Sequence, residues 1–130
     1  MTFKTKNTVG WILSGLIGLM LAASAFDKII GSAHALQMGT SFGLFAATYS
    51  LLGVIEILSV LLFLYPGTGL LGTLLLSSYL GGAIATHLQH QQNIVFPIAI
   101  EAFVWIAAVL RFPELMQRLF NRTAMNNTTP

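Results

Sequence analysis

Four long runs of apolar residues, separated by short polar segments, dominate the sequence. The runs cover about residues 9–26, 42–64, 69–87 and 94–110. Each is close to the roughly 20 residues that a helix needs to cross the hydrocarbon core of a bilayer. Helices also satisfy their backbone hydrogen bonds internally, as hydrocarbon requires. The pattern therefore predicts an all-α integral membrane protein, built as an antiparallel four-helix transmembrane bundle.

The connections between the runs support this order of helices. Tyr65-Pro66-Gly67 is a turn signal, and it makes the second and third runs tight antiparallel neighbours. A Gly- and Ser-containing loop that holds His34 joins the first two runs, and the polar segment HLQHQQN leads into the last. Pro97 falls in the first turn of the last run, where a missing N–H is tolerated.

The segment behind the last run is amphipathic. Its apolar residues fall on one side of a helix and its charged residues on another: Leu115, Met116, Leu119 and Phe120 against Glu114, Arg118 and Arg122. This separation predicts a short C-terminal amphipathic helix that lies on the membrane surface.

The first run has two interpretations. Lys4, Lys6, the apolar stretch and the Ala-Ser-Ala sequence at 23–25 imitate a cleavable signal peptide. Against cleavage, the stretch of about 18 residues is longer than the apolar part of most signal peptides. It also carries small residues suited to close helix packing, namely Gly15, Gly18, Ala22 and Ala25. The balance favours a retained first span.

Composition supports the membrane class and excludes several functions. Hydrophobic residues make up 55% of the chain and charged residues 8%, with a mean hydropathy of +0.80, whereas soluble domains are about 25% charged. The 130 residues leave no room for a separate soluble domain, so we expect one transmembrane domain over 1–130 in a lipid bilayer. A net charge of +2 without a basic patch excludes nucleic acid as a partner. The absence of cysteine excludes disulfides, thiolate metal sites and a thiol redox relay.

Charges near the ends of the runs predict the orientation. Lys28 stands alone on one side, and five basic residues fall on the other: Lys4, Lys6, Arg111, Arg118 and Arg122. Because cytoplasmic segments carry an excess of Lys and Arg, both termini are expected in the cytoplasm.

Two glutamates inside apolar runs are the strongest functional candidates. Glu56 lies in the second run and Glu101 in the fourth. A carboxyl group that faces lipid is costly, so such residues turn toward a partner, a cavity or a ligand. As a structural group, Glu56 is expected to be neutral and bonded to Ser59, Tyr79 or a facing carbonyl. Glu101 is expected to be satisfied by Trp105 or Tyr79. The sequence leaves structural and functional roles open for both.

Helical periodicity places other residues beside these glutamates. One face of the second run holds Tyr49, Gly53, Glu56, Ser59 and Phe63. One face of the fourth run holds Pro97, Glu101, Trp105 and Ala108, and the third run offers Ser78, Gly82 and Thr86 with Tyr79 and His87 beside them. If these faces converge, they enclose a narrow polar slot that opens outward.

Charged and imidazole side chains gather near the outer ends of the runs. Asp27 and Lys28 are either interfacial anchors with a local ion pair or groups that bind a substrate. His87 and His90 share a helical face, but two ligands from one helix do not make a metal site, and a haem pair normally uses different helices. We therefore predict no metal.

Four segments of the sequence resemble the DoxX-like family of small bacterial four-helix membrane proteins. They are WILSGLIGLMLAASAFDKI at 11–29, LLGVIEIL at 51–58, YLGGAIATHL at 79–88 and AVLRFPEL at 108–115. The stretch from Tyr79 to His87 is the most specific, followed by Glu56 and Lys28. Phe112 departs from the family pattern, in which a polar residue usually precedes the proline. Glu101 is not a family hallmark, so membrane physics alone supports it.

The resemblance implies a multi-pass protein of the bacterial inner membrane with a connection to quinones, because the family name comes from membrane subunits associated with thiosulfate:quinone oxidoreductase. A quinone needs hydrogen-bond donors and a proton source. On this hypothesis Glu56 and His87 relay protons, a redox partner protein supplies electrons, and the slot residues that bind the quinone are Lys28, Tyr79, Gly82, Thr86, Glu101 and Trp105.

The alternative is a non-enzymatic protein, either a small oligomeric transporter or an accessory subunit that helps another membrane protein to assemble. The small-residue seams favour helix association within or between chains, including a homo-oligomer. The sequence does not decide whether the protein is an enzyme.

Overall fold

The computed structural model describes residues 2–120, which form helices and short connections without any strand. The helices, in chain order, are α1 (Phe3–Ile30), α2 (Ala33–Ser41), α3 (Ala46–Leu64), the 3-10 turn η1 (Pro66–Thr68), α4 (Gly69–Gln89), α5 (Val95–Arg111) and α6 (Pro113–Phe120). Arg122, which the sequence assigns to the amphipathic helix and to the charge count, lies outside the described residues.

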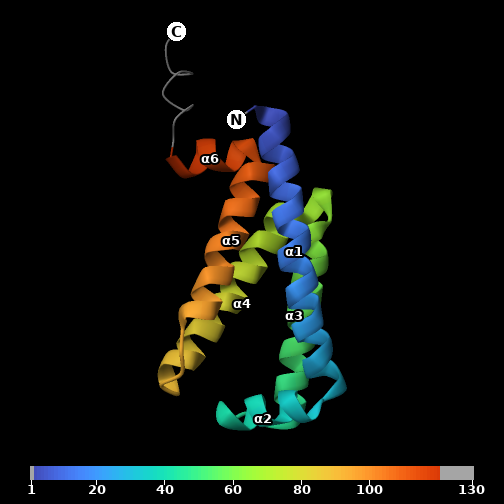
Figure 1. Ribbon diagram of the computed structural model, residues 1–130, viewed down its shortest axis with the longest axis vertical. Helices are drawn as coiled ribbons and strands as arrows, with labels where there is room; N and C mark the ends of the chain where they lie inside the picture. The colour runs from blue at the N-terminus through green and yellow to red at the C-terminus, as the bar shows by residue number, and fades with distance from the viewer. Residues whose placement is uncertain (1, 121–130) are drawn as a thin grey trace.

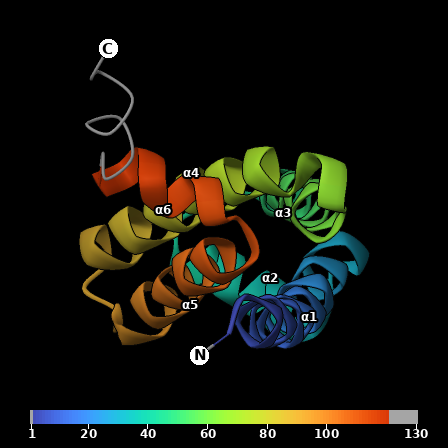
Figure 2. The ribbon, with the colours of Figure 1, turned by 90° about the horizontal axis from the view of Figure 1, so that it is seen from above.

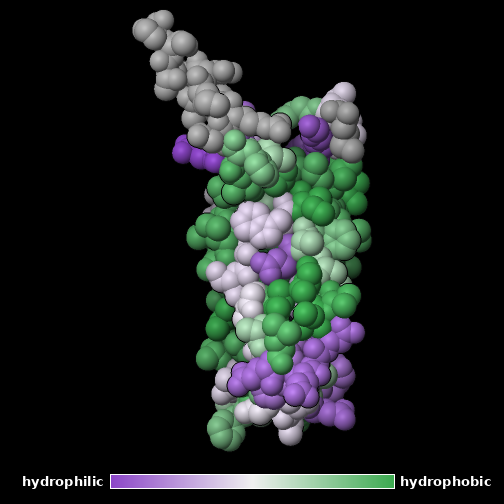
Figure 3. All heavy atoms as spheres, turned by 90° about the vertical axis from the view of Figure 1, so that its left-hand side faces the viewer, coloured by the Kyte–Doolittle hydropathy of each residue, from purple (hydrophilic) through white to green (hydrophobic). Residues whose placement is uncertain are grey.

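Within residues 2–120, three helices are long and apolar enough to cross a membrane: α1, α3, and α4 together with η1. The 17-residue α5 joins this set only when it is counted with α6, from which a bend of 108° separates it. The prediction of an all-helical membrane protein is confirmed. On the face shown in Figure 3, a hydrophobic belt lies between hydrophilic residues near the two ends of the molecule.

Each long helix contacts two others. The helix α1 packs against α3 and α5, and α4 also packs against α3 and α5 (Figure 2). The start of α1 and α6 lie at one end of the molecule, here called the α6 end, and α2 crosses the opposite end, the α2 end (Figure 1). From the α6 end toward the α2 end, α4 and α5 diverge from α1 and α3.

The hydrophobic core lies where the helices are still close. Its largest fully buried apolar side chains include Phe63 of α3, Leu76 of α4 and Val104 of α5, with Ile17 and Leu21 of α1 beside them. Gly72 permits the closest approach, because a Cβ at this position would overlap the backbone of Phe63. The core therefore holds the α6 end together and leaves space between the helices toward the α2 end.

The segment between the first two spans differs from the predicted loop. Ser32 accepts a hydrogen bond from the N–H of Ala35 (3.0 Å) and so caps α2, a helix that the sequence analysis missed. Gly43, with φ +69°, follows α2, and α3 begins only at Ala46 rather than near residue 42. The first helix is also longer than its apolar run, because Thr2 caps it and Gly31, with φ +65°, ends it.

The predicted small-residue stripe of α1 is used only in part. Gly18 packs against Leu64, where a Cβ would come within 2.8 Å of Cδ1. Gly15 has no atom of another helix within 4 Å of the place its Cβ would take. Another glycine of α1, Gly10, makes a tight contact with Arg111 of α5.

Arg111 is buried at the α6 end, with 6% of its surface exposed. Its guanidinium carbon lies 4.0 Å from the ring centroid of Trp11, 5.0 Å from that of Phe63 and 4.9 Å from that of Phe112. Nη1 donates to Ser14 (3.1 Å), whereas Nε and Nη2 have no hydrogen-bond partner within the described chain. The sequence analysis gave Arg111 a role only as one of the basic residues that predict the orientation in the membrane. In the structure it joins three helices through aromatic contacts.

Candidate functional site

A cavity of about 690 Å³ occupies the space where the helices diverge. Residues of α1, α2, α3, α4 and α5 line it, and most of the lining is apolar. The polar groups that face it include Lys28 at the end of α1, Glu56 of α3, and Tyr79 and His87 of α4. Apolar walls with a few convergent polar groups are typical of a ligand site.

An ion pair between α1 and α3 is the centre of these polar groups. Nζ of Lys28 lies 2.6 Å from Oε2 of Glu56 and donates a second bond to Oγ of Ser24 (2.8 Å). The hydroxyl of Tyr79 donates to the same carboxylate oxygen of Glu56 (3.1 Å). Only 2% of the Glu56 side chain and 12% of the Lys28 side chain are exposed. A buried charge needs such partners, and here each charge has one.

The partners of Glu56 differ in part from those that the sequence analysis expected. Tyr79 is a partner, as predicted, but Ser59 donates to the carbonyl of Ile55 (2.8 Å) instead of to Glu56. The additional partner is Nζ of Lys28, 2.6 Å from Oε2, so this carboxylate oxygen accepts from two donors.

Gly53 explains how a lysine at the end of one helix reaches a glutamate near the middle of another. A Cβ on Gly53 would lie 2.8 Å from the carbonyl oxygen of Ala25 and 2.8 Å from Cβ of Lys28. Without that Cβ, α1 and α3 touch at this level. The Lys28 stem then runs about one helical turn along α3 to the carboxylate of Glu56.

Aromatic rings and unused polar atoms surround the ion pair. Nζ of Lys28 lies 5.6 Å from the ring centroid of Tyr49 and 5.8 Å from that of Tyr79, within the range of cation–π attraction. Both bonds to Glu56 use Oε2, so Oε1 is available to a donor. Lys28 has a third N–H beyond those to Ser24 and Glu56.

His87 stands on the same helix as Tyr79 but nearer the α2 end. Its Nδ1 lies 2.7 Å from the carbonyl of Ala83, and because a carbonyl only accepts, Nδ1 carries the proton and the neutral ring has an acceptor at Nε2. The ring of Phe42, just after α2, packs on the His87 ring, with 4.8 Å between the two ring centroids. Eight residues along a helix place His87 about 12 Å from the level of Tyr79.

The two other predicted binding residues of α4 also line the cavity. Thr86 donates to the carbonyl of Gly82 (2.9 Å), and Gly82 has no neighbouring atom within 4 Å of an added Cβ. The cavity thus brings together six of the predicted site residues: Lys28, Glu56, Tyr79, Gly82, Thr86 and His87.

Glu101 and Trp105 are placed elsewhere, and the expected convergence of all three faces is incomplete. Oγ of Ser77 donates to Oε1 of Glu101 (2.7 Å) and accepts from Nε1 of Trp105 (3.2 Å). The helix α5 presents Pro97 and Ile100 to the cavity instead. Glu56 and Glu101 therefore belong to two separate polar clusters.

Polar side chains beside the cavity make local contacts. Asp27 and His34 approach to 3.1 Å between Oδ2 and Nδ1. His90 bonds through Nδ1 to the carbonyl of Thr86 (2.9 Å), and its ring lies 5.9 Å from that of Phe42. Within residues 2–120, no three His, Cys, Asp or Glu side chains come together in a way that could hold a metal ion.

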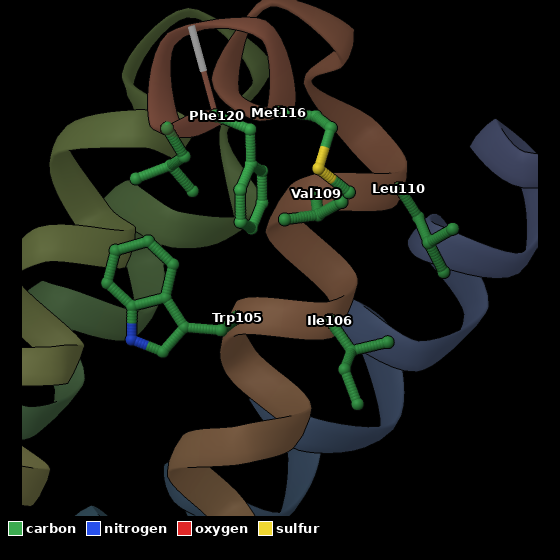
Figure 4. Close-up of a pocket in the computed structure, with 7 residues that line it drawn as sticks. Trp105, Ile106, Val109, Leu110, Met116 and Phe120 are labelled. Carbon is green, nitrogen blue, oxygen red and sulfur yellow. The ribbon is translucent and has the colours of Figure 1, made fainter. Parts of the chain in front are cut away.

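A second hollow lies between α5 and α6, apart from the cavity that holds the Lys28–Glu56 ion pair. It is a shallow groove of about 540 Å³ with an apolar lining, in which Met116 and Phe120 of α6 point back toward Val109 and Trp105 of α5 (Figure 4). This arrangement agrees with an amphipathic α6 whose apolar side turns toward the membrane-spanning part of the chain.

Sequence reasoning missed three residues that shape the two polar clusters. Ser24 lies four residues before Lys28, so helical spacing was a usable signal for their contact. Ser77, which joins Glu101 to Trp105, and Phe42, which packs on His87, had no such signal. Their partners come from other segments of the chain.

These observations define an all-helical membrane protein with an ion pair in a cavity between its helices. A model of the DoxX-like family matches residues 12–109, and the chain belongs to this family. No curated protein and no solved structure matches the chain.

Proposed function

We propose that the protein binds a membrane-dissolved quinone in the cavity, as a quinone-binding or redox-linked membrane subunit. The observation that carries this proposal is the Lys28–Glu56 ion pair, with Tyr79 on it, inside otherwise apolar walls. A quinone has a polar head group with two carbonyl oxygens and an apolar body, so it matches both parts of such a cavity.

The free polar atoms suit both redox forms of the head group. The third N–H of Lys28 is a donor for a quinone carbonyl, and Oε1 of Glu56 and Nε2 of His87 are acceptors for quinol hydroxyls. Reduction of a quinone takes two electrons and two protons. On the proposal a redox partner protein supplies the electrons. Each proton enters from the α2 side at Nε2 of His87, is taken up by the Glu56 carboxylate and passes from it to the reduced head group, so both residues end as they began.

The proposal includes an arrangement in the membrane. The helices α1, α3, α4 and α5 form an antiparallel four-helix transmembrane bundle and a single domain, with α5 near the lower end of the roughly 17–25 residues that span a bilayer. On the proposal both termini lie in the cytoplasm of a bacterium and the bundle lies in the inner membrane, and the excess of Lys and Arg near the termini and the end of α5 supports this orientation.

The test is to purify the protein in mild detergent and to measure quinone by absorbance and mass spectrometry. We expect near-stoichiometric quinone with the wild type and less with Lys28→Met, because that change removes the free donor and leaves Glu56 without its cation. Glu101→Gln is the matched control, since Glu101 lies outside the cavity. A wild type without quinone would contradict the proposal.

The second candidate is an accessory or transporter subunit that works in a homo-oligomer or with another membrane protein. Gly15 and Gly81 favour it, because each is exposed and has open space where a Cβ would stand, as a docking helix requires. A stable partner protein in a quinone-free preparation would support this candidate instead.

A further inference from the structure

Part of the cavity wall is also outer surface of the molecule, between α3 and α4. Ile55 of α3 is 43% exposed and Leu75 of α4 is 40% exposed, and both line the cavity. Ser78 and Gly82, farther along α4, are exposed and line it too. The cavity is therefore open sideways between these two helices.

This opening lies at the depth of the hydrocarbon core. Ile55 is at the middle of α3 (Ala46–Leu64), and Ser78 is near the middle of α4 (Gly69–Gln89). The two helices are held together at η1, where Gly72 packs on the backbone of Phe63, and they separate toward the α2 end (Figure 1). What adjoins the opening in a bilayer is lipid chain rather than water.

The α2 end of the cavity is bridged by side chains. Phe42 packs on His87 and His90, and Nε2 of Gln92 donates to Oγ of Ser41 (3.2 Å). These contacts tie the end of α2 to α4 and to the segment before α5. A large ligand that came from water would have to separate them.

We propose that the ligand enters the cavity sideways from the bilayer, between α3 and α4, and that it carries a long hydrocarbon tail which stays in this opening. The inference rests on the proposed function, because Lys28, Glu56 and Tyr79 hold the head group at the inner end of the same cavity. The ligand class is thereby narrowed to tailed quinones. Short, water-soluble quinones lack the part that fills the opening.

Gly82 and its neighbour provide a matched pair of variants. Neither Gly81 nor Gly82 has an atom within 4 Å of an added Cβ, so the fold has room for the first carbon of a larger side chain at both positions. Only Gly82 lines the cavity. Gly82→Phe narrows the opening, whereas Gly81→Phe adds the same ring to the same helix outside it.

The experiment compares a tailed quinone with a tail-free quinone of the same head group, bound to protein in lipid nanodiscs and counted by native mass spectrometry. We expect the ratio of the two affinities to fall about tenfold or more in Gly82→Phe, because two buried methylene groups already contribute that much. In Gly81→Phe the ratio stays at its wild-type value. Thermal unfolding of both variants confirms that they fold.

The outcomes separate this inference from the proposed function. A wild type that binds neither quinone overturns both. A wild type that binds both quinones, with the same ratio in Gly82→Phe as in Gly81→Phe, keeps the quinone site and overturns the sideways opening.

The direction of entry has its own test. The chain has no cysteine, so Ser41→Cys and Gln92→Cys can be joined by a thiol cross-linker across the α2 end. We expect tailed quinone to load at the wild-type rate after cross-linking. Loading that stops on cross-linking and recovers when the linker is cleaved would show entry from the α2 end and overturn the proposal.

Discussion

Lys28 turns its ammonium group along α3, to 2.6 Å from Glu56, although it stands only two residues before the end of α1. Lysines near helix ends usually extend toward water. Here the Lys28 stem passes Gly53, and Nζ lies within 6 Å of the ring centroids of both Tyr49 and Tyr79. The lysine thus provides the charge that a glutamate at mid-membrane depth needs.

The ion pair predicts a non-additive double-mutant cycle. Lys28→Met and Glu56→Gln should each lower the free energy of unfolding by about 3–5 kcal/mol, because each leaves one buried charge without its partner. The double variant should lose clearly less than the sum. Thermal or denaturant unfolding in detergent measures this. Additive losses would mean that the two groups do not form a pair in the membrane.

Glu101 should behave differently from Glu56. Glu101→Gln keeps an oxygen for the hydroxyl of Ser77, so we expect a loss of stability of no more than about 1 kcal/mol, whereas Glu101→Leu strands Ser77 and costs about 1–3 kcal/mol. Neither change should alter quinone binding, since Glu101 lies outside the cavity. A Glu101→Gln protein that folds but no longer binds quinone would contradict this prediction and would assign quinone binding to Glu101.

Glycine substitutions should separate tight from open helix positions. Gly72→Ala places a methyl group on the backbone of Phe63 and should destabilise the protein by about 1–3 kcal/mol. Gly15→Ala is the control, because the same methyl group there meets open space and should be neutral or stabilising by about 0.5–1 kcal/mol. The measurement is the melting temperature of each variant in detergent. Equal melting temperatures for Gly72→Ala and Gly15→Ala would contradict the packing of α3 on α4.

Arg111 should tolerate loss of its charge better than loss of its shape. Two of its nitrogens have no partner in the described chain, so Arg111→Met removes unpaired buried polar atoms while keeping apolar contact with Trp11 and Phe63. Arg111→Lys keeps a buried charge and loses the planar stacking, and we expect it to be the less stable variant by about 1 kcal/mol or more. The free energies of unfolding of the two variants in detergent test this order. A more stable Arg111→Lys would contradict the proposed role of the aromatic contacts.

The orientation predicts the behaviour of reporter fusions. A reporter after Pro130 should be active only if it is a type that works in the cytoplasm, and one inserted near Gln91 only if it works after export. The opposite pattern would place the α2 end in the cytoplasm. A mature N-terminus at Phe26 in the same preparation would show cleavage of the first span.

The sequence alone determined the class of the protein, the approximate helices and most of the α3 face, because apolar runs and helical spacing are local properties. Gly53, Glu56, Ser59 and Phe63 are buried as their spacing predicted. The α5 face was predicted less well. Its buried side follows Ile100, Val104 and Ala107, which pack in the core and turn Glu101 and Trp105 away from the cavity.

Only the tertiary structure decided which polar groups meet. The residues of the ion pair are 28 positions apart, and their contact depends on how closely α1 approaches α3 at Gly53, which no local pattern encodes. The separation of Glu101 from Glu56 likewise depends on the rotation of α5, which is set by the fit of apolar side chains from α1 and α4. Depth and rotation are properties of the packed helices together, so they could not be predicted from each helix alone.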